Sequence, residues 1–183
     1  MKSDKNIFDP KRLAVTALLA AFAAVLGYID AILPVFGFLP VPGMKLGLAN
    51  LAVLLALWLL GPVEAAAVSF LRILVVNLLL FPSTTALAFS LAGGTCSFLV
   101  MLLLKKLSFH VIPVSVCGSA AHNLAQTALA ALMLGTRQLF SYLLLLLPVG
   151  ALCGALLGLL SALIVPRIAP ILKSGKNAGK NRE

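Results

Sequence analysis

The chain has 183 residues, of which 62% are hydrophobic and only 10% charged, and its mean hydropathy is +1.13. These values exclude a water-soluble domain, in which about 25% of the residues are charged, and they predict a protein of the lipid bilayer. The formal net charge of +9 could suggest a nucleic-acid partner. However, the cations concentrate at the ends of the expected helices and in the tails, and they form no binding face with aromatic residues, so no nucleic-acid partner is expected.

The hydrophobic stretches are typical of transmembrane helices. A lipid-facing β-barrel would alternate apolar and polar residues, whereas residues 73–104 and 138–166 contain no Asp, Glu, Lys or Arg. Residues 13–29 are too long for the core of a signal peptide and lack a small-residue cleavage site, so we expect them to form the first span. The sequence therefore predicts an all-α membrane protein, a bundle of six transmembrane helices, with seven tightly packed helices as the alternative.

Proline and glycine residues mark the expected breaks between helices. They divide the chain into a polar head (1–12), a transmembrane domain (13–166) and a basic tail (167–183). Within the transmembrane domain, helices are expected at about 12–33, 44–60, 62–80, 85–105, 111–134 and 138–165.

The distribution of Lys and Arg predicts the orientation of the bundle. Cations are concentrated in the head, in the pair Lys105 and Lys106, and in the tail. With an even number of spans these three regions share one side of the membrane, and cytoplasmic segments are the ones enriched in Lys and Arg. We therefore expect a multi-pass protein of the cell membrane with both termini in the cytoplasm.

One external connection, residues 30–45, is long, apolar and rich in proline, with Pro34, Pro40 and Pro42. A flexible linker would be polar. We expect this segment to fold over the outer mouth of the bundle as a lid, and the alternative is a loop that lies in the lipid interface.

Strongly polar side chains from four of the expected helices fall in the outer half of the membrane, whereas the inner half offers only small hydroxyl groups. Ionisable and amide groups are costly in lipid, so this clustering predicts a binding pocket that opens outward. The alternative is that the amides only form hydrogen bonds between helices. Arg72 lies near the midplane and is the strongest candidate to bind an anionic solute. The expected substrate-binding residues are Lys45, Asn50, Arg72, Asn77, Ser90, His122, Asn123 and Gln126.

Small residues spaced four apart allow helices to approach closely. Gly150, Gly154 and Gly158 in the last helix are expected to pack within the bundle. Two stripes in the first helix could serve either internal packing or the docking of another subunit, and they comprise Ala17 with Ala21 and Ala20 with Ala24.

The sequence lacks the motifs of catalysis. Gly175 and Lys176 are followed by Asn177, so no phosphate-binding loop of the Gly-Lys-Ser/Thr type is present, and any ATP-driven role requires other subunits. Paired acids, an activated nucleophile and metal-ligand spacings are also absent, as are disulfide-like pairs among the three cysteines. We expect no enzyme activity, no cofactor and no metal.

Four motifs in order along the chain resemble one bacterial family. They are Pro42-Gly-Met-Lys-Leu-Gly-Leu-Ala-Asn50, Leu71-Arg-Ile73, Ser90-Leu-Ala-Gly-Gly94 and His122-Asn-Leu-Ala-Gln126. The family is that of the Gx transporters, also described as heptaprenyl diphosphate synthase component I, and it looks like the substrate-binding S components of energy-coupling factor (ECF) transporters.

The resemblance implies six helices, an outward pocket under the first loop, and a first helix whose Ala-x-x-x-Ala motifs contact a transmembrane coupling subunit. It conflicts with a synthase activity, because trans-prenyl synthases use clustered aspartates to hold magnesium diphosphate. Here the aspartates are Asp4, Asp9 and Asp30, which are not clustered.

The leading hypothesis is therefore a substrate-binding membrane subunit that captures a small, anionic, partly apolar solute from outside. Its partners would be the lipid bilayer, a coupling subunit and two ATPase subunits. Two alternatives remain: a non-catalytic membrane component associated with heptaprenyl diphosphate or quinone synthesis, and a self-contained secondary transporter.

Overall fold

The structure is a computed structural model that describes residues 10–32, 47–80 and 82–180, with side chains as far as 172. Every element in these ranges is helical, and no strand occurs in them, so the predicted all-α fold is confirmed. Pro10 and Pro62 each begin a helix, Ser83 immediately precedes one and Gly135 immediately follows one, as expected from the prolines, glycines and polar turns of the sequence. The elements are α1 (Pro10–Ile32), α2 (Asn50–Leu59), α3 (Pro62–Leu74), the π-helix η1 (Val75–Leu80), α4 (Thr84–Lys106), α5 (Val111–Leu134), the 3-10 helix η2 (Arg137–Tyr142) and α6 (Leu143–Lys180).

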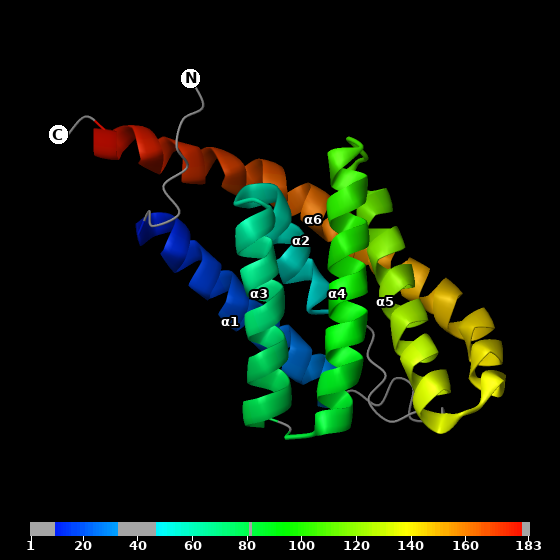
Figure 1. Cartoon of the computed structure of the whole chain (residues 1–183). Helices are drawn as coiled ribbons and strands as arrows, with labels where there is room; N and C mark the ends of the chain where they lie inside the picture. Colours follow the sequence, from blue (N-terminus) through cyan, green and yellow to red (C-terminus); the bar gives the residue numbers. More distant parts are fainter. Residues whose placement is uncertain (1–9, 33–46, 81, 181–183) are drawn as a thin grey trace.

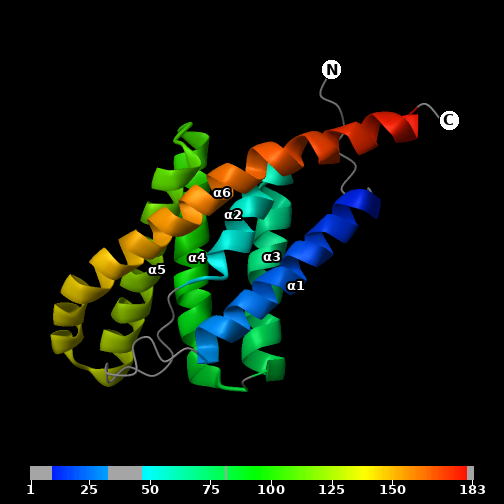
Figure 2. The ribbon, with the colours of Figure 1, turned by 180° about the vertical axis from the view of Figure 1, so that it is seen from behind.

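Helix α2 lies at the centre of the bundle and contacts each of the other five α-helices of the described chain (Figure 1 and Figure 2). Its residues from Asn50 to Leu57 are all buried. Ten residues rise only about 15 Å, roughly half the hydrocarbon core of a bilayer. A single buried helix that is apolar on all sides is therefore the centre around which the longer helices pack.

Helix α2 begins later than the expected range 44–60. Gly47 has φ of +82°, a left-handed conformation that favours glycine and interrupts the helix. The backbone N–H groups of Gly47 and Leu48 donate to Oδ2 of Asp30 at 2.8 and 3.2 Å. This contact links the end of α1 to the start of α2, and residues 44–46 lie outside the described ranges.

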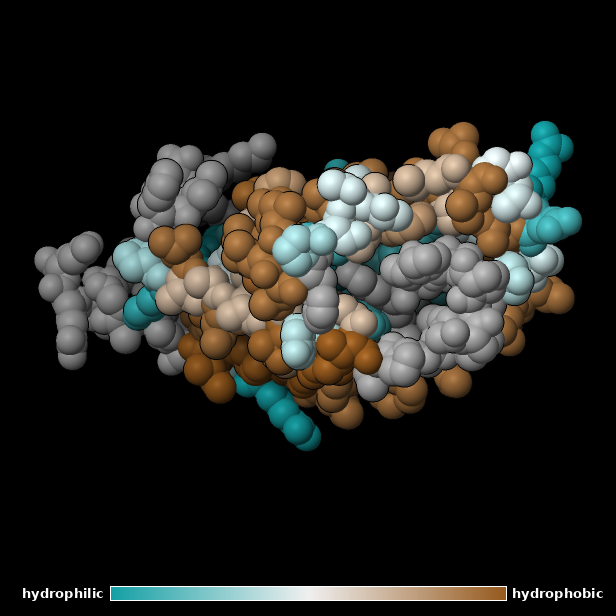
Figure 3. All heavy atoms as spheres, turned by 90° about the horizontal axis from the view of Figure 1, so that it is seen from below, coloured by the Kyte–Doolittle hydropathy of each residue, from teal (hydrophilic) through white to brown (hydrophobic). Residues whose placement is uncertain are grey.

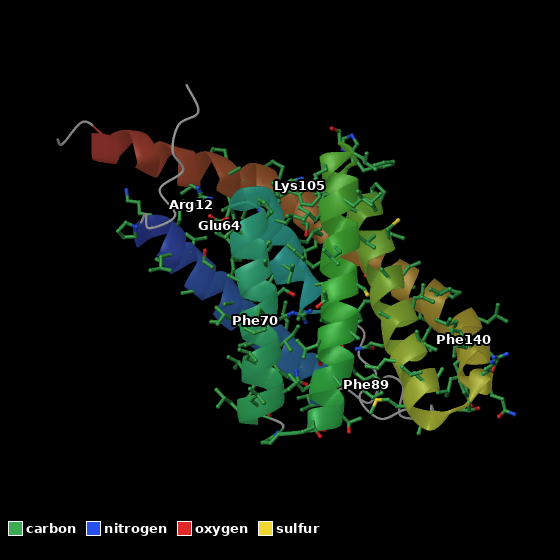
Figure 4. All side chains as sticks on the ribbon, in the orientation of Figure 1. Arg12, Glu64, Phe70, Phe89, Lys105 and Phe140 are labelled. Carbon is green, nitrogen blue, oxygen red and sulfur yellow. The ribbon has the colours of Figure 1, made fainter. Side chains whose placement is uncertain are left out.

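Two cations satisfy carbonyl groups at the opposite end of α2. Nη2 of Arg12 donates to the carbonyl of Leu60 at 2.5 Å, and Nζ of Lys105 donates to that of Leu57. Arg12 also forms an ion pair with Glu64. Figure 4 shows Arg12, Glu64 and Lys105 at the same end of the bundle. Cations at a helix C-terminus and an acid at its N-terminus both stabilise the helix dipole.

The outer surface of the bundle is apolar. Large hydrophobic side chains on five of the helices are exposed, and hydrophobic residues dominate the rim of the described part in the view from below (Figure 3). Four helical stretches are long and apolar enough to cross a membrane, namely Pro10–Ile32, Pro62–Leu80, Thr84–Lys106 and Arg137–Leu172. Exposed side chains of this kind are suited to lipid, so the chain is a multi-pass membrane protein.

Helix α6 does not end at 165 as expected but continues to Lys180 (Figure 1). Its 38 residues rise about 57 Å, well beyond the thickness of a hydrocarbon core. Pro166 and Pro170 lie inside the helix and on its exposed surface. Water or lipid head groups can satisfy the carbonyl that each proline frees there, so these prolines do not terminate the helix.

The glycines of α6 allow it to pack closely against α5. A Cβ atom at Gly154 would lie 2.9 Å from Cα of Val116, and one at Gly158 would lie 2.9 Å from Cα of Ile112. Both neighbours are backbone atoms, which cannot move aside as a side chain can. The expected packing of the glycine stripe within the bundle is confirmed.

Replacing Gly154 with Val should therefore separate α5 from α6. Overpacking a close helix contact costs about 1–3 kcal/mol, which a thermal unfolding measurement in detergent would detect as a lower Tm. The matched control is Ala128→Val, because Ala128 is exposed on the lipid-facing side of α5. Equal stability of the two variants would contradict the close packing.

Candidate functional site

A small polar pocket lies between helices α1, α3, α4 and α5. The space at this site, counted together with its open mouth, is about 320 Å³. The lining residues are Gly27, Asp30, Gly47, Arg72, Ile73, Val76, Asn77, Ser90 and His122.

The π-helix η1 places two polar residues on the same side of the third span. Asn77 lies five positions after Arg72, and in a regular α-helix the two would be about 140° apart. A π-helix closes its hydrogen bonds between residues five apart, so its wider turn brings Asn77 back toward the face of Arg72. Both side chains line the pocket as a result.

Arg72 is held in place by a chain of hydrogen bonds from two other helices. Its Nη2 donates to Oδ1 of Asn50 at 3.1 Å, and Nδ2 of Asn50 donates to Oγ of Ser97 at 3.3 Å. Arg72 is only 8% exposed, yet its Nε has no acceptor among the described residues. The guanidinium group is therefore fixed in orientation with one buried N–H left to donate.

Asn77 and Ser90 form a second polar pair at the pocket. Nδ2 of Asn77 donates to the carbonyl of Ile73 at 2.8 Å, and Oγ of Ser90 donates to Oδ1 of Asn77 at 3.2 Å. Asn77 is 1% exposed. The bond to Ile73 fixes the amide within its own helix, and the bond from Ser90 links the third span to α4.

His122 fits between two glycines. A Cβ atom at Gly93 would lie 2.8 Å from Cε1 of His122, and one at Gly47 would lie 3.9 Å from its Cδ2. A larger residue at Gly93 would push the imidazole ring out of its position. Because Gly93 of α4 has no side chain, His122 has enough space to reach the pocket.

Three of the expected site residues in the described ranges, Asn50, Asn123 and Gln126, do not line the pocket. Nδ2 of Asn123 donates to the carbonyl of Leu146 at 3.0 Å, and Nε2 of Gln126 lies 3.5 Å from the carbonyl of Phe89. These contacts join α5 to α6 and to α4. For Asn123 and Gln126 the structure thus favours the alternative, in which the amides form hydrogen bonds between helices. Asn50 accepts a hydrogen bond from Arg72 and so helps to orient that side chain.

Four of the expected residues, Arg72, Asn77, Ser90 and His122, are brought together around one space. Lys45 lies outside the described residues, as does most of the expected lid. Asp30 lines the pocket, although it was not predicted as a binding residue. Its position at the end of the first span, directly before the proline-rich connection, is the feature of the sequence that could have indicated a place at the pocket.

The charges of the described pocket are mixed. Asp30 is 5% exposed and interacts electrostatically with the guanidinium group of Arg72. The described residues contain no group of three or more His, Cys, Asp or Glu side chains that could hold a metal ion. The arrangement can bind and orient a polar group, and it offers a fixed donor beside a buried carboxylate.

The alanine stripes of α1 differ in exposure. Ala17 and Ala21 are exposed, whereas Ala20 and Ala24 are half-buried against the bundle. Internal packing therefore explains the second pair but not the first. The exposed pair leaves a shallow strip on the surface of α1 that a small-residue stripe of another helix could fit.

The fold and the pocket together define an all-α membrane protein whose helices surround a small polar pocket. The structure resembles a solved one described as "Structure and mechanism of the S component of a bacterial ECF transporter". The TM-score is 0.64 at 21% sequence identity, covering 90% of this chain and 98% of that chain. The chain therefore has the fold of an ECF S component.

A profile of the family described as heptaprenyl diphosphate synthase component I matches residues 19–164. The chain belongs to this family, which is also the Gx transporter family, and the expected resemblance is confirmed. No curated protein matches the chain significantly.

A double-mutant cycle tests the link between Arg72 and Asn50. Asn50→Leu should destabilise the wild-type protein more than it destabilises the Arg72→Met variant, because only the wild type retains a buried cation that loses its acceptor. The expected coupling is about 1 kcal/mol, a typical value for polar contacts between membrane helices. Unfolding titrations in mixed detergent micelles would measure it.

Asn123→Leu provides the matched control, because Asn123 is an equally buried amide that bonds to Leu146 and not to Arg72. Its effect should add to that of Arg72→Met without coupling. A coupling of the same size in both cycles would show that Asn50 has no specific role at Arg72.

Proposed function

We propose that this protein is the substrate-binding membrane subunit of an ATP-driven uptake transporter of the ECF type. It captures a small, anionic, partly apolar solute from outside the cell. The observation that carries the proposal is the buried Arg72, whose Nε has no acceptor among the described residues although it lies at the wall of a pocket. A buried charged donor without an acceptor is costly, and a bound solute would supply the acceptor.

The composition of the pocket suits a solute with both polar and apolar parts. Arg72 supplies the charge, and Asn77 and Ser90 supply amide and hydroxyl groups. Ile73 and Val76 form the apolar wall, and Gly27 leaves room beside them, since a Cβ atom there would lie 3.0 Å from Cγ2 of Val76. Lys45, outside the described residues, remains a proposed second cation at the mouth.

The proposed orientation puts both termini in the cytoplasm of a cell and the protein in the cell membrane. Arg12 and Lys105 lie at one end of the bundle (Figure 4), and Lys106 ends α4 nearby in the sequence. Helix α6 ends at the same end, where α1 begins (Figure 1). Cytoplasmic segments are enriched in Lys and Arg, so the pocket opens toward the opposite, external side.

The energy for transport comes from other subunits in this proposal. The sequence contains no phosphate-binding loop, so a transmembrane coupling subunit and two ATPase subunits would complete the transporter. The exposed Ala17 and Ala21 on α1 would contact the coupling subunit, and the half-buried Ala20 and Ala24 would hold α1 to the bundle.

The family description favours a second candidate function, a non-catalytic membrane component associated with heptaprenyl diphosphate or quinone synthesis. In that role the pocket would be dispensable, and a synthase would depend on the protein for its position at the membrane. The two functions are separable, because only the first predicts that substitutions in the pocket abolish activity.

Arg72→Met should remove solute binding while leaving expression and folding intact, because Met fills a similar volume without a charge. Native mass spectrometry of the gently purified protein would compare the small molecules that wild type and variant retain. Arg137→Met is the control, since Arg137 is exposed and does not line the pocket. Retention of the same solute by Arg72→Met would remove Arg72 from the site.

The proposed subunit contact predicts a different pattern. Ala21→Trp should reduce co-purification with the coupling subunit and the ATPases by at least about tenfold, because a bulky ring prevents close approach of helices. Ala128→Trp makes the same change at an exposed alanine of α5 and should have little effect. If neither variant nor wild type associates with an ATPase module, the transport function is wrong.

A further inference from the structure

The last part of α6, residues 167–180, extends beyond the bundle. The preceding part, from Leu143 to Pro166, rises about 36 Å, so it is long enough to cross a hydrocarbon core of about 30 Å with a tilt. In the described chain α6 packs against α5, α2 and η2, and it makes no contact with α1, α3 or α4. Residues 167–180 are therefore helical without being needed to span the membrane.

This part of α6 runs crosswise to the bundle. Helices α3 and α4 pack together and reach from one end of the bundle to the other, so their direction approximates the membrane normal (Figure 1). Figure 1 and Figure 2 both show the end of α6 lying across this direction. Pro166 and Pro170 lie inside the helix where this part begins, and prolines inside a helix bend it. Arg12 and Lys105 mark the same end of the bundle (Figure 4), so residues 167–180 are placed at the level of the lipid head groups.

The charge of residues 167–180 is positive throughout. Their cations are Arg167, Lys173, Lys176 and Lys180. No acid occurs in the sequence between Glu64 and Glu183. Because no acid of the same segment neutralises these cations, the segment attracts an anionic partner.

The helical register separates the lysines from the apolar residues. At 100° per residue, the three lysines fall within a sector of about 60° around the helix axis. Apolar and small residues fill a separate sector of about 120°, and they are Ile168, Ile171, Leu172, Gly175, Ala178 and Gly179. Arg167 borders this sector on the side away from the lysines. Ile168 and Ile171 are exposed, so the bundle leaves the apolar sector uncovered.

An apolar sector between cations is typical of a helix that lies in the membrane interface. Apolar side chains then enter the boundary of the acyl chains, while the long stems of lysine and arginine let their charges reach the head groups. A soluble acidic partner would match the charge but would leave the exposed isoleucines in water. The lipid surface matches both, and it already lies beside this part of α6.

We propose that residues 167–180 form a surface helix that binds anionic lipid head groups at the end of the bundle where α1 begins. Arg167 and the three lysines bind the head groups, and Ile168, Ile171 and Leu172 enter the interface. This inference requires only that the chain spans a membrane, so it does not depend on the proposed transport function.

A cysteine scan of the full chain in lipid nanodiscs tests where this helix lies. After replacement of Cys96, Cys117 and Cys153 by Ala, an environment-sensitive nitrobenzoxadiazole label is attached at one new cysteine. Ile171→Cys and Ala178→Cys place the label in the apolar sector, and Ser174→Cys and Asn177→Cys are the matched controls outside it. In phosphatidylcholine with about one third phosphatidylglycerol, aqueous dithionite should reduce the first two labels at least about threefold more slowly.

The lipid charge is tested at the same labels. Nanodiscs of phosphatidylcholine alone, or high salt, should reduce the protection of the Ile171→Cys label at least about twofold, because surface attraction is screened or lost. Replacing Lys173, Lys176 and Lys180 together by Gln should have the same effect, whereas replacing all three by Arg should preserve the protection. Lys106→Gln removes an exposed cation at the end of α4 and should change little.

Two results would overturn the proposal. Equal reduction rates at all four label positions in the anionic nanodiscs would show that the helix does not lie in the interface. Protection that is unchanged without phosphatidylglycerol and in the triple Gln variant would show that anionic head groups do not bind it. Nanodiscs carry the same lipids in both leaflets, so either result holds whichever way the bundle is oriented.

Discussion

The structure depends on one constraint, which is that the short helix α2 is buried on all sides and its terminal backbone groups need partners from the protein. In lipid each unsatisfied backbone group costs several kcal/mol. Asp30 accepts N–H groups at the start of α2, and Arg12 and Lys105 donate to carbonyls at its end. These side chains come from α1 and α4, so the helices that surround α2 are positioned by the need to satisfy it.

The same constraint shapes the binding site. Asp30 holds α2 and also lines the pocket, and Asn50, the first residue of α2, orients Arg72. The polar groups that form hydrogen bonds at the start of α2 are therefore also the ones that determine the charge and geometry of the pocket. A change at Asp30 or Asn50 would therefore alter both the central helix and the pocket.

Much of the architecture was predictable from the sequence because lipid leaves few options. Hydrophobic runs broken by proline and glycine indicate helices. The expected depth of Arg72, Asn77, Ser90 and His122 in the membrane predicted that they lie in one region, and all four line the pocket. What could not be predicted depends on contacts between distant residues. The hydrogen bond from Gly47 to Asp30 accompanies a later start of α2 than expected, and the exposed position of the prolines in α6 lets that helix continue. No spacing rule reveals the π-helix η1, whose wider turn places Asn77 on the same side as Arg72. Asn123 and Gln126 share the expected region but bond to neighbouring helices.

The glycine contacts between α5 and α6 have a mechanical consequence. The glycines bring the backbones of α5 and α6 into contact, and Gly118 of α5 makes room for the side chain of Met101 of α4. These three helices therefore form one closely packed unit. The connection from α3 to α4 across the pocket is much less extensive. The α1–α3 part of the bundle is therefore less tightly joined to α4 at the pocket than α4, α5 and α6 are to one another, and the hydrogen bond between Asn77 and Ser90 crosses this boundary.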